Sequence, residues 1–122
     1  MTKSRIELGQ IGEKLAYTEL TRMGYKVLAQ NYRCRIGEID IIAEDGETLV
    51  FIETKTRNKT ETSIAKEAVN IRKQHKIAKT ALTYMKNNNL MEKRVRFDVV
   101  AISLKESEPH IEIIKNAFDF EI

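Results

Sequence analysis

Cysteine, proline and tryptophan are scarce in this chain of 122 residues, which has one cysteine, one proline and no tryptophan. The single cysteine, Cys34, cannot form an internal disulfide, and the N-terminus lacks the apolar stretch of a signal peptide; both features predict a reducing, cytoplasmic location. Cys34 and the two histidines do not have the spacing of a structural zinc site, which needs about four ligands. No apolar run approaches the roughly 18 residues of a membrane-spanning helix, so no membrane association is expected.

Charged residues are abundant, at 32% of the chain, beside 42% hydrophobic residues. The length fits one domain over residues 1–122 that can bury a core without disulfides. Residues 55–96 carry twelve Lys or Arg and three Glu, whereas the rest of the chain carries nine basic and fifteen acidic residues. This asymmetry indicates a face suited to a polyanion, although a solvated charged helix would have the same composition.

The hydrophobic pattern predicts elements in the order α-β-β-β-α-β-β. The expected helices cover Ile6–Met23 and Lys66–Asn87, and the expected strands cover Tyr25–Asn31, Gly37–Glu44, Thr48–Arg57, Arg94–Leu104 and His110–Lys115. Asp45-Gly46 predicts an antiparallel hairpin between the second and third strands. The second helix is long enough for a crossover connection, which permits parallel pairing of the third and fourth strands. We therefore expect an α/β fold with a mixed sheet flanked by two helices.

Each predicted helix has one face at 3.6-residue spacing that is expected to pack on the sheet. These faces are Ile6, Gly9, Glu13, Ala16, Leu20 and Met23 in the first helix, and Ile71, Gln74, Ala78, Ala81, Leu82 and Met85 in the second. Glu13 is unusual there, and the neighbouring Gly9 and Gly12 allow a backbone or a ligand to approach closely. Because glutamate is rarely buried without a partner, Glu13 is a carboxylate near the helix start, half of a salt bridge, for example to Lys55, or a functional acid.

Two strands carry further acids. In the second strand, alternation places Asp40 on the face opposite Ile39 and Ile41. In the third strand, Glu53 and Lys55 share a face, and the hairpin places Asp40 on the neighbouring strand. We therefore expect Glu13, Asp40, Glu53 and Lys55 to converge.

Three converging acids need more positive charge than one lysine supplies. Two carboxylates ~5 Å apart repel by roughly 3 kcal/mol at an effective dielectric constant of about 20. A divalent cation offsets more of this repulsion, and oxygen ligands without His or Cys favour Mg²⁺, with Mn²⁺ as a substitute. Such an ion polarises a phosphoryl oxygen and generates hydroxide, while Lys55 orients the water or stabilises the developing charge. The pattern thus predicts a site for phosphodiester hydrolysis.

The sequence resembles the YraN family of small bacterial endonuclease-like proteins over nearly its whole length. The matching segments are Gly9-Gln10-Ile11-Gly12-Glu13, Asn31-Tyr32-Arg33, Gly37-Glu38-Ile39-Asp40, Phe51-Ile52-Glu53-Thr54-Lys55-Thr56-Arg57, Ala68-Val69-Asn70, Arg72-Lys73-Gln74, Arg96-Phe97-Asp98-Val99 and Asn116-Ala117-Phe118. The family is similar to the PD-(D/E)xK superfamily, which includes restriction endonucleases and archaeal Holliday-junction resolvases. The resemblance implies a restriction endonuclease-like fold with Asp40 as the motif aspartate, Glu53 and Lys55 as the E-x-K element, and Glu13 as the helical acid. Ile39 stands where the superfamily name has proline, a residue without a chemical role.

The leading hypothesis is a Mg²⁺-dependent endonuclease that acts on branched or otherwise structured DNA. Its catalytic residues would be Glu13, Asp40, Glu53 and Lys55, and its metal ligands Asp40, Glu53 and Glu13. Phosphate contacts are predicted for Arg33, Arg35, Arg57, Lys73, Lys76 and Lys79. The alternatives are a nucleic-acid-binding adaptor of the same fold with little or no catalysis, and an RNA-directed nuclease. Because so short a chain covers little DNA alone, a homodimer or another partner is also considered.

Two more polar residues lie in apolar surroundings. Asp98, between Phe97 and Val99, is interpreted as a structural residue paired with Arg96. Gln74 is interpreted either as a residue that reaches the site or as a buried amide.

Overall fold

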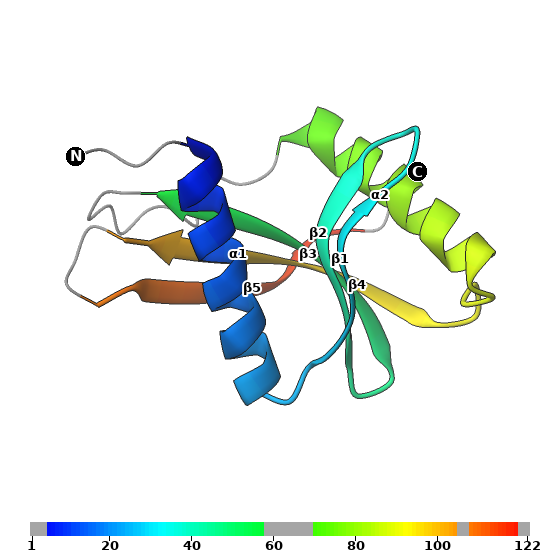
Figure 1. Cartoon of the computed structure of the whole chain (residues 1–122). Coiled ribbons are helices and arrows are strands. Elements are labelled where there is room, and N and C mark those ends of the chain that lie inside the picture. Colours follow the sequence, from blue (N-terminus) through cyan, green and yellow to red (C-terminus); the bar gives the residue numbers. More distant parts are fainter. Residues whose placement is uncertain (1–4, 58–69, 105–107, 120–122) are drawn as a thin grey trace.

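The computed structural model describes residues 5–57, 70–104 and 108–119, which form a five-stranded mixed sheet with one helix on each face (Figure 1). The elements are α1 (Arg5–Arg22), β1 (Lys26–Arg33), β2 (Glu38–Asp45), β3 (Thr48–Arg57), α2 (Ile71–Asn87), β4 (Arg94–Ser103) and β5 (His110–Phe118). The strands lie in the order β1-β2-β3-β4-β5; β3 and β4 are parallel, and the other neighbouring pairs are antiparallel. The predicted α/β fold and element order are confirmed. In the described ranges, neither helix is long and apolar enough to span a bilayer.

Glycines with positive φ lie at the end of α1 and in the turn between β2 and β3. After α1, Gly24 has a φ of 97°, the amide of Tyr25 donates to the carbonyl of Leu20 at 2.9 Å, and the amide of Gly24 donates to that of Thr21 at 3.0 Å. These two bonds satisfy carbonyls at the helix end and turn the chain into β1. In the predicted hairpin between β2 and β3, Gly46 has a φ of 62°, as a tight turn requires.

The two faces of the sheet carry separate cores. The core under α2 contains Ile39, Ile42, Leu49, Phe51, Ile77, Ala78, Ala81, Met85, Phe97 and Val99. The core under α1 contains Ala16, Leu20, Tyr25, Ile41, Ala43, Val50, Ile52, Val100 and Ile102. Because the central strands are covered on both faces, their sequences are nearly continuous apolar runs.

The predicted inward faces of the helices are wrong at the helix ends. Ile6 is 74% exposed, Met23 is 44% exposed and Ile71 is 64% exposed. In Figure 1, α1 crosses the strands steeply. Its residues Ala16 and Leu20 are fully buried, whereas Ile6 in its first turn is exposed. Ile71 is the first residue of α2; the rest of the predicted helical start, residues 66–69, lies outside the described residues. The strands β1 and β5 also extend beyond their predicted ends, to Arg33 and Phe118.

Simple alternation fails in β2 at Asp40. Ile39 packs in the core under α2, whereas Ile41 packs in the core under α1, so the prediction that they share a face is wrong. The register places Asn31 of β1 opposite Asp40, and Asn31 has a φ of 53°. Asparagine tolerates this left-handed conformation better than most residues, and the conformation changes the direction of the chain.

The same point marks the end of pairing between β2 and β3. The last paired residues are Ile41 and Ile52, although β3 continues to Arg57. Figure 1 shows the two strands diverging beyond this point, with β3 staying beside β4. We call this divergence of β2 and β3, which begins at the pair Ile41 and Ile52, the fork. At the fork, backbone and side chains of both strands face a common space.

Candidate functional site

A cavity of about 520 Å³ lies at the fork, next to the first half of α1. It is lined by Leu8, Gly9, Glu13, Asp40, Glu53, Thr54, Thr56 and Arg57. The three acids predicted to converge thus reach one cavity from three different elements, α1, β2 and β3.

Helix α1 reaches the cavity because a glycine lets it rest on β3. A Cβ on Gly12 would overlap the hydroxyl oxygen of Thr56, whereas a Cβ on Gly9 would meet nothing within 4 Å. The close approach at Gly12 places the next residue, Glu13, at the cavity wall. The predicted close approach is therefore found at Gly12, where the neighbour is the Thr56 side chain and not a backbone, and it is not found at Gly9.

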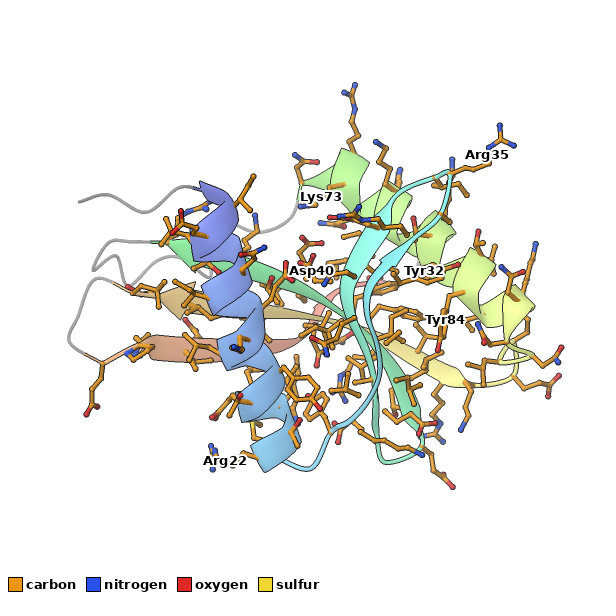
Figure 2. All side chains as sticks on the ribbon, viewed as in Figure 1. Arg22, Tyr32, Arg35, Asp40, Lys73 and Tyr84 are labelled. Atoms are coloured by element: carbon orange, nitrogen blue, oxygen red, sulfur yellow. The ribbon has the colours of Figure 1, made fainter. Side chains whose placement is uncertain are left out.

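Asp40 is anchored by the strand from which β2 has separated. Its Oδ2 accepts hydrogen bonds from the Thr54 amide at 2.8 Å and from the Thr54 hydroxyl at 3.1 Å, and the residue is 8% exposed. These side-chain bonds connect β2 to β3 beyond the pair Ile41 and Ile52, where the backbone hydrogen bonds between the two strands end. They also fix the orientation of the carboxylate toward the cavity. Figure 2 shows Asp40 in the space between α1 and β2.

The acids of the cavity carry more negative charge than their surroundings neutralise. Burial and repulsion from Asp40 raise the pKa of Glu53 to about 7, although Nζ of Lys73 lies 3.0 Å from Glu53 Oε1 and opposes the shift. Burial and Asp40 also raise the pKa of Glu13, while a hydrogen bond from the Asn31 side chain lowers it. The cavity therefore favours either protons or an added cation.

The donors at the cavity fit a hard divalent ion. They are carboxylate and hydroxyl oxygens, without histidine or cysteine. The described residues include no group of three or more His, Cys, Asp or Glu placed to hold a metal ion. Mg²⁺ usually keeps several waters and binds through one or two carboxylates and phosphate oxygens, so Asp40 and Glu53 are sufficient for it. Mn²⁺ fits the same oxygen donors.

The predicted cationic residues divide into two groups. Arg57 lines the cavity, Lys73 contacts Glu53, and Lys55 lies half-buried on β3 two residues after Glu53, outside the set that lines the cavity. The other four lie farther out. Of these, Arg33 pairs with Glu38 at 2.8 Å and is largely exposed, and Lys76 and Lys79 are exposed on α2.

Arg35 belongs to the outer group as well. It is exposed in the connection between β1 and β2, and in Figure 2 it extends away from Asp40. Gln74, interpreted as a possible site residue, is half-buried in a different hollow, with Ile71, His75 and Phe118.

Sequence reasoning missed three contributors to the site: Asn31, Thr54 and the contact of Lys73 with Glu53. Asn31 lies in a segment that carries the family resemblance, and an asparagine inside a strand is a signal for an unusual backbone. Thr54 lies in another such segment, but its bond to Asp40 depends on the divergence of β2 from β3. The contact of Lys73 joins residues 20 positions apart and carries no local signal.

A second buried acid, Asp98, lies away from the cavity in a complete network. Its Oδ1 accepts from Arg96 Nε at 2.8 Å and from the Asn116 amide at 3.0 Å, and its Oδ2 accepts from the Tyr25 hydroxyl and from Arg96 Nη2, both at 3.0 Å. Arg96 Nη2 also donates to Asp45 at 2.9 Å. The predicted pairing of Asp98 with Arg96 is confirmed.

The fold and the cavity define a class: α/β proteins with an acidic site at a fork in a mixed sheet. The chain belongs to the family described as "Uncharacterised protein family UPF0102", the YraN family, whose sequence model matches residues 12–102. The matched range contains all four residues predicted to be catalytic. The family resemblance read from the sequence is thus confirmed.

Bacterial relatives match almost end to end. A UPF0102 protein of Syntrophus aciditrophicus (strain SB) is 46% identical over 114 residues, which cover 93% of this chain and 90% of the relative. One of Geotalea daltonii is 46% identical, covering 92% and 89%. One of Moorella thermoacetica is 42% identical, covering 97% and 100%.

Among solved structures, the chain is similar to that of Pyrococcus furiosus SfsA in complex with Ca²⁺. The identity is 17% and the TM-score 0.39, and the match covers 88% of this chain and 61% of that chain. Similarity at this level carries no argument about function.

Proposed function

We propose that the protein is a metal-dependent endonuclease that hydrolyses phosphodiester bonds in structured or branched DNA, with Mg²⁺ as cofactor and Mn²⁺ as a substitute. The observation that carries the proposal is the gathering of Glu13, Asp40 and Glu53 in one cavity at the fork of β2 and β3. Buried acids that repel one another are uncommon in structural positions and typical of functional sites.

Each residue of the cavity has a role that follows from its position. Asp40, oriented by Thr54, and Glu53 are the ligands of the ion, and Glu13 is the third acid at the same cavity. A divalent ion held there would polarise a phosphoryl oxygen and lower the pKa of a bound water. Arg57 contacts the phosphate from the cavity wall. Lys55 is not among the residues that line the cavity; it lies two residues after Glu53 on β3 and keeps its predicted role, which is to orient the attacking water or stabilise the developing negative charge.

The cationic residues around the cavity support a polyanionic substrate. Arg33, Arg35, Lys76 and Lys79 are exposed and are assigned to phosphates of the nucleic acid outside the reacting one. The preference for DNA, and for branched or structured DNA, follows from the likeness to junction-resolving enzymes. A homodimer would extend the length of DNA that one particle covers. A cytoplasmic location is part of the same proposal.

An adaptor that binds nucleic acid without cutting it is a second candidate. The observation in its favour is that no three metal-binding side chains in the described ranges are grouped to hold an ion as they stand. Such an adaptor would use the same cationic surface and would need no divalent ion.

A cleavage panel tests these proposals. The protein is incubated with linear, nicked, flapped and four-way DNA, and with RNA, in Mg²⁺, Mn²⁺ or EDTA. We expect cleavage of branched DNA with either ion and none in EDTA. The Asp40→Asn variant, purified in parallel, should not cut, whereas Lys79→Gln should still cut. Binding without cleavage would support the adaptor, and cleavage of RNA alone would support the RNA-directed nuclease. Cleavage that persists in Asp40→Asn would contradict the site.

A further inference from the structure

Lys73 supplies an ammonium in direct contact with Glu53. The distance from Nζ to Oε1 is 3.0 Å; the Glu53 side chain is 11% exposed, and that of Lys73 is 48% exposed. The carboxylate is therefore held in the protein, while the ammonium approaches it from the solvent side. An ion pair of this kind can open without unfolding the surrounding structure.

The start of α2 holds Lys73 in a position that a helix disfavours. Asn70 caps the helix, and its side-chain oxygen accepts from the Lys73 amide at 2.9 Å. The first turn contains Arg72 and Lys73 but no acid, although the positive end of the helix dipole favours acids there. A residue that breaks a local rule in this way usually has a compensating interaction or a function. For Lys73 the compensating interaction is with Glu53.

The position of the ammonium is also where a metal ion would lie. Glu53 is a proposed ligand, and a Mg²⁺–oxygen bond is about 2.1 Å long. An ammonium that stayed about 3 Å from the same carboxylate oxygen would be within a few ångströms of the ion and would repel it strongly. The side chain of Lys73 faces solvent and has more room to move than the largely covered side chain of Glu53.

We propose that Lys73 is an internal counter-ion that neutralises Glu53 in the metal-free protein and leaves it when a divalent ion binds. The released ammonium then turns to a phosphate oxygen of the nucleic acid. This inference rests on the proposed function for its second step, but the exchange of one cation for another can be measured without nucleic acid. Lys73 is thus a positioning residue that keeps the acids ready for metal, and not a ligand.

The test is a calorimetric titration of metal-free protein with Mn²⁺ alone. Lys73→Met removes the charge at nearly constant length, and we expect it to bind Mn²⁺ about tenfold more tightly, because one repelling charge is gone. Without metal it should melt at a lower temperature than the parent, and saturating Mn²⁺ should remove that difference. Lys73→Arg, which keeps the charge, should bind Mn²⁺ like the parent. Lys86→Gln is the matched control, because Lys86 is exposed on the same helix and has no assigned role, and neither quantity should change.

The outcomes separate this inference from the proposed function. Equal or weaker Mn²⁺ binding by a folded Lys73→Met variant would overturn the inference, because Lys73 would then be an ordinary structural ion pair. Tighter Mn²⁺ binding together with no cleavage of any substrate would uphold the inference and overturn the nuclease proposal. If neither parent nor variant binds Mn²⁺, both proposals fall.

Discussion

The protein contains two clusters of carboxylates, each with one buried aspartate, and the clusters differ in how their charge is balanced. Asp98, fully buried, receives four hydrogen bonds, two of them from the guanidinium of Arg96. At the fork, Glu13, Asp40 and Glu53 face one cavity, and the ammonium of Lys73 contacts Glu53. The first cluster is balanced within the fold, whereas the second has an excess of negative charge.

Hydrogen bonding does not account for this difference. No buried side-chain nitrogen or oxygen in the part of the chain that the structure describes lacks a hydrogen-bond partner. At the fork the difference lies in charge: Asp40 repels both Glu13 and Glu53 and raises their pKa values. A fold can retain a cluster of like charges at a cost in stability when the cluster binds a ligand. We therefore interpret Asp98 as a residue that stabilises the fold and the acids at the fork as a binding site.

The largest effect is expected from Asp98→Ala. It removes the buried carboxylate that Arg96 contacts, leaves Arg96 with Asp45 and the Tyr25 hydroxyl oxygen as acceptors, and leaves the Tyr25 hydroxyl without its own acceptor. The free energy of unfolding should therefore fall by about 3–5 kcal/mol. Urea denaturation measures the loss. Asp45→Ala, which removes a half-buried partner of the same arginine, should cost clearly less. A loss for Asp98→Ala of only about 1 kcal/mol, the value of a surface pair, would remove the contrast between the clusters.

The next effect is expected from Gly12→Ala at the contact of α1 with β3. The added methyl overlaps Thr56, so α1 must move, at a cost of about 1–3 kcal/mol in urea denaturation. Because Glu13 moves with the helix, binding of Mn²⁺ should weaken as well. Gly9→Ala is the matched control: its Cβ meets nothing, and alanine favours helix, so stability should hold or rise by up to about 1 kcal/mol. Equal effects of the two substitutions would show that α1 does not rest on Thr56.

The fork should also make stability depend on pH. Because the folded pKa of Glu53 is raised to about 7 from 4.5, the folded state holds this proton more tightly than the unfolded state. The resulting stabilisation is complete below about pH 4.5 and is lost as the pH rises through about 7. Glu53→Gln should therefore be more stable than the parent near pH 8 in EDTA, by ~1–2 kcal/mol after the lost contact with Lys73 is allowed for.

Thermal melts of both proteins across this pH range provide the check. The difference in stability should shrink toward pH 5, where Glu53 is protonated in the folded parent. Glu13→Gln, at a more exposed acid, should show the same sign with a smaller difference. A constant difference at all pH values would mean that Glu53 does not titrate in this window.

The smallest effect is expected at the outer cationic residues. Replacing Lys79 by Gln removes one phosphate contact, so the log–log dependence of DNA affinity on salt should lose about 1 from its slope, equally for all sequences. Fluorescence anisotropy in Ca²⁺, measured over a range of salt concentrations, provides the slope. Lys26→Gln, at an exposed lysine that begins β1, serves as control and should not change it. An unchanged slope for Lys79→Gln would remove α2 from the binding surface.

Much of the fold could be predicted from the sequence because its signals are local. Asp45-Gly46 predicted the hairpin, and the bounds Thr48–Arg57 of β3 agree with prediction residue for residue. The length of the second predicted helix correctly allowed the parallel pairing of β3 and β4. The errors at Ile6 and Ile71 arise because periodicity gives the phase of a helix but not how far it extends past the sheet.

The sequence was enough to predict which acids form the site, but not the backbone geometry that brings them together. Glu13 was conspicuous as an acid on an apolar helical face, and the hairpin brought Asp40 near Glu53. The reversal of faces at Asp40 was not predictable, because it depends on the left-handed backbone of Asn31 and on the end of pairing at Ile41.

The pairing of Lys73 with Glu53 was not predictable either. It depends on where α2 starts, which the Asn70 cap determines, and on how α2 lies over the sheet. Lys73 was therefore assigned only to phosphate.

Calorimetric titration with Mn²⁺, paired with melts of the metal-free proteins, tests the central claim that the acids at the fork form a metal site. Asp40→Asn should lose Mn²⁺ affinity, because a neutral amide is a poorer ligand for a hard cation, and should gain roughly 1 kcal/mol of metal-free stability from relieved repulsion. Lys55→Ala should keep or strengthen Mn²⁺ binding and lose stability, because positive charge leaves the vicinity of the acids. If both variants match the parent in Mn²⁺ affinity and in stability, these residues are ordinary charges and the claim is contradicted.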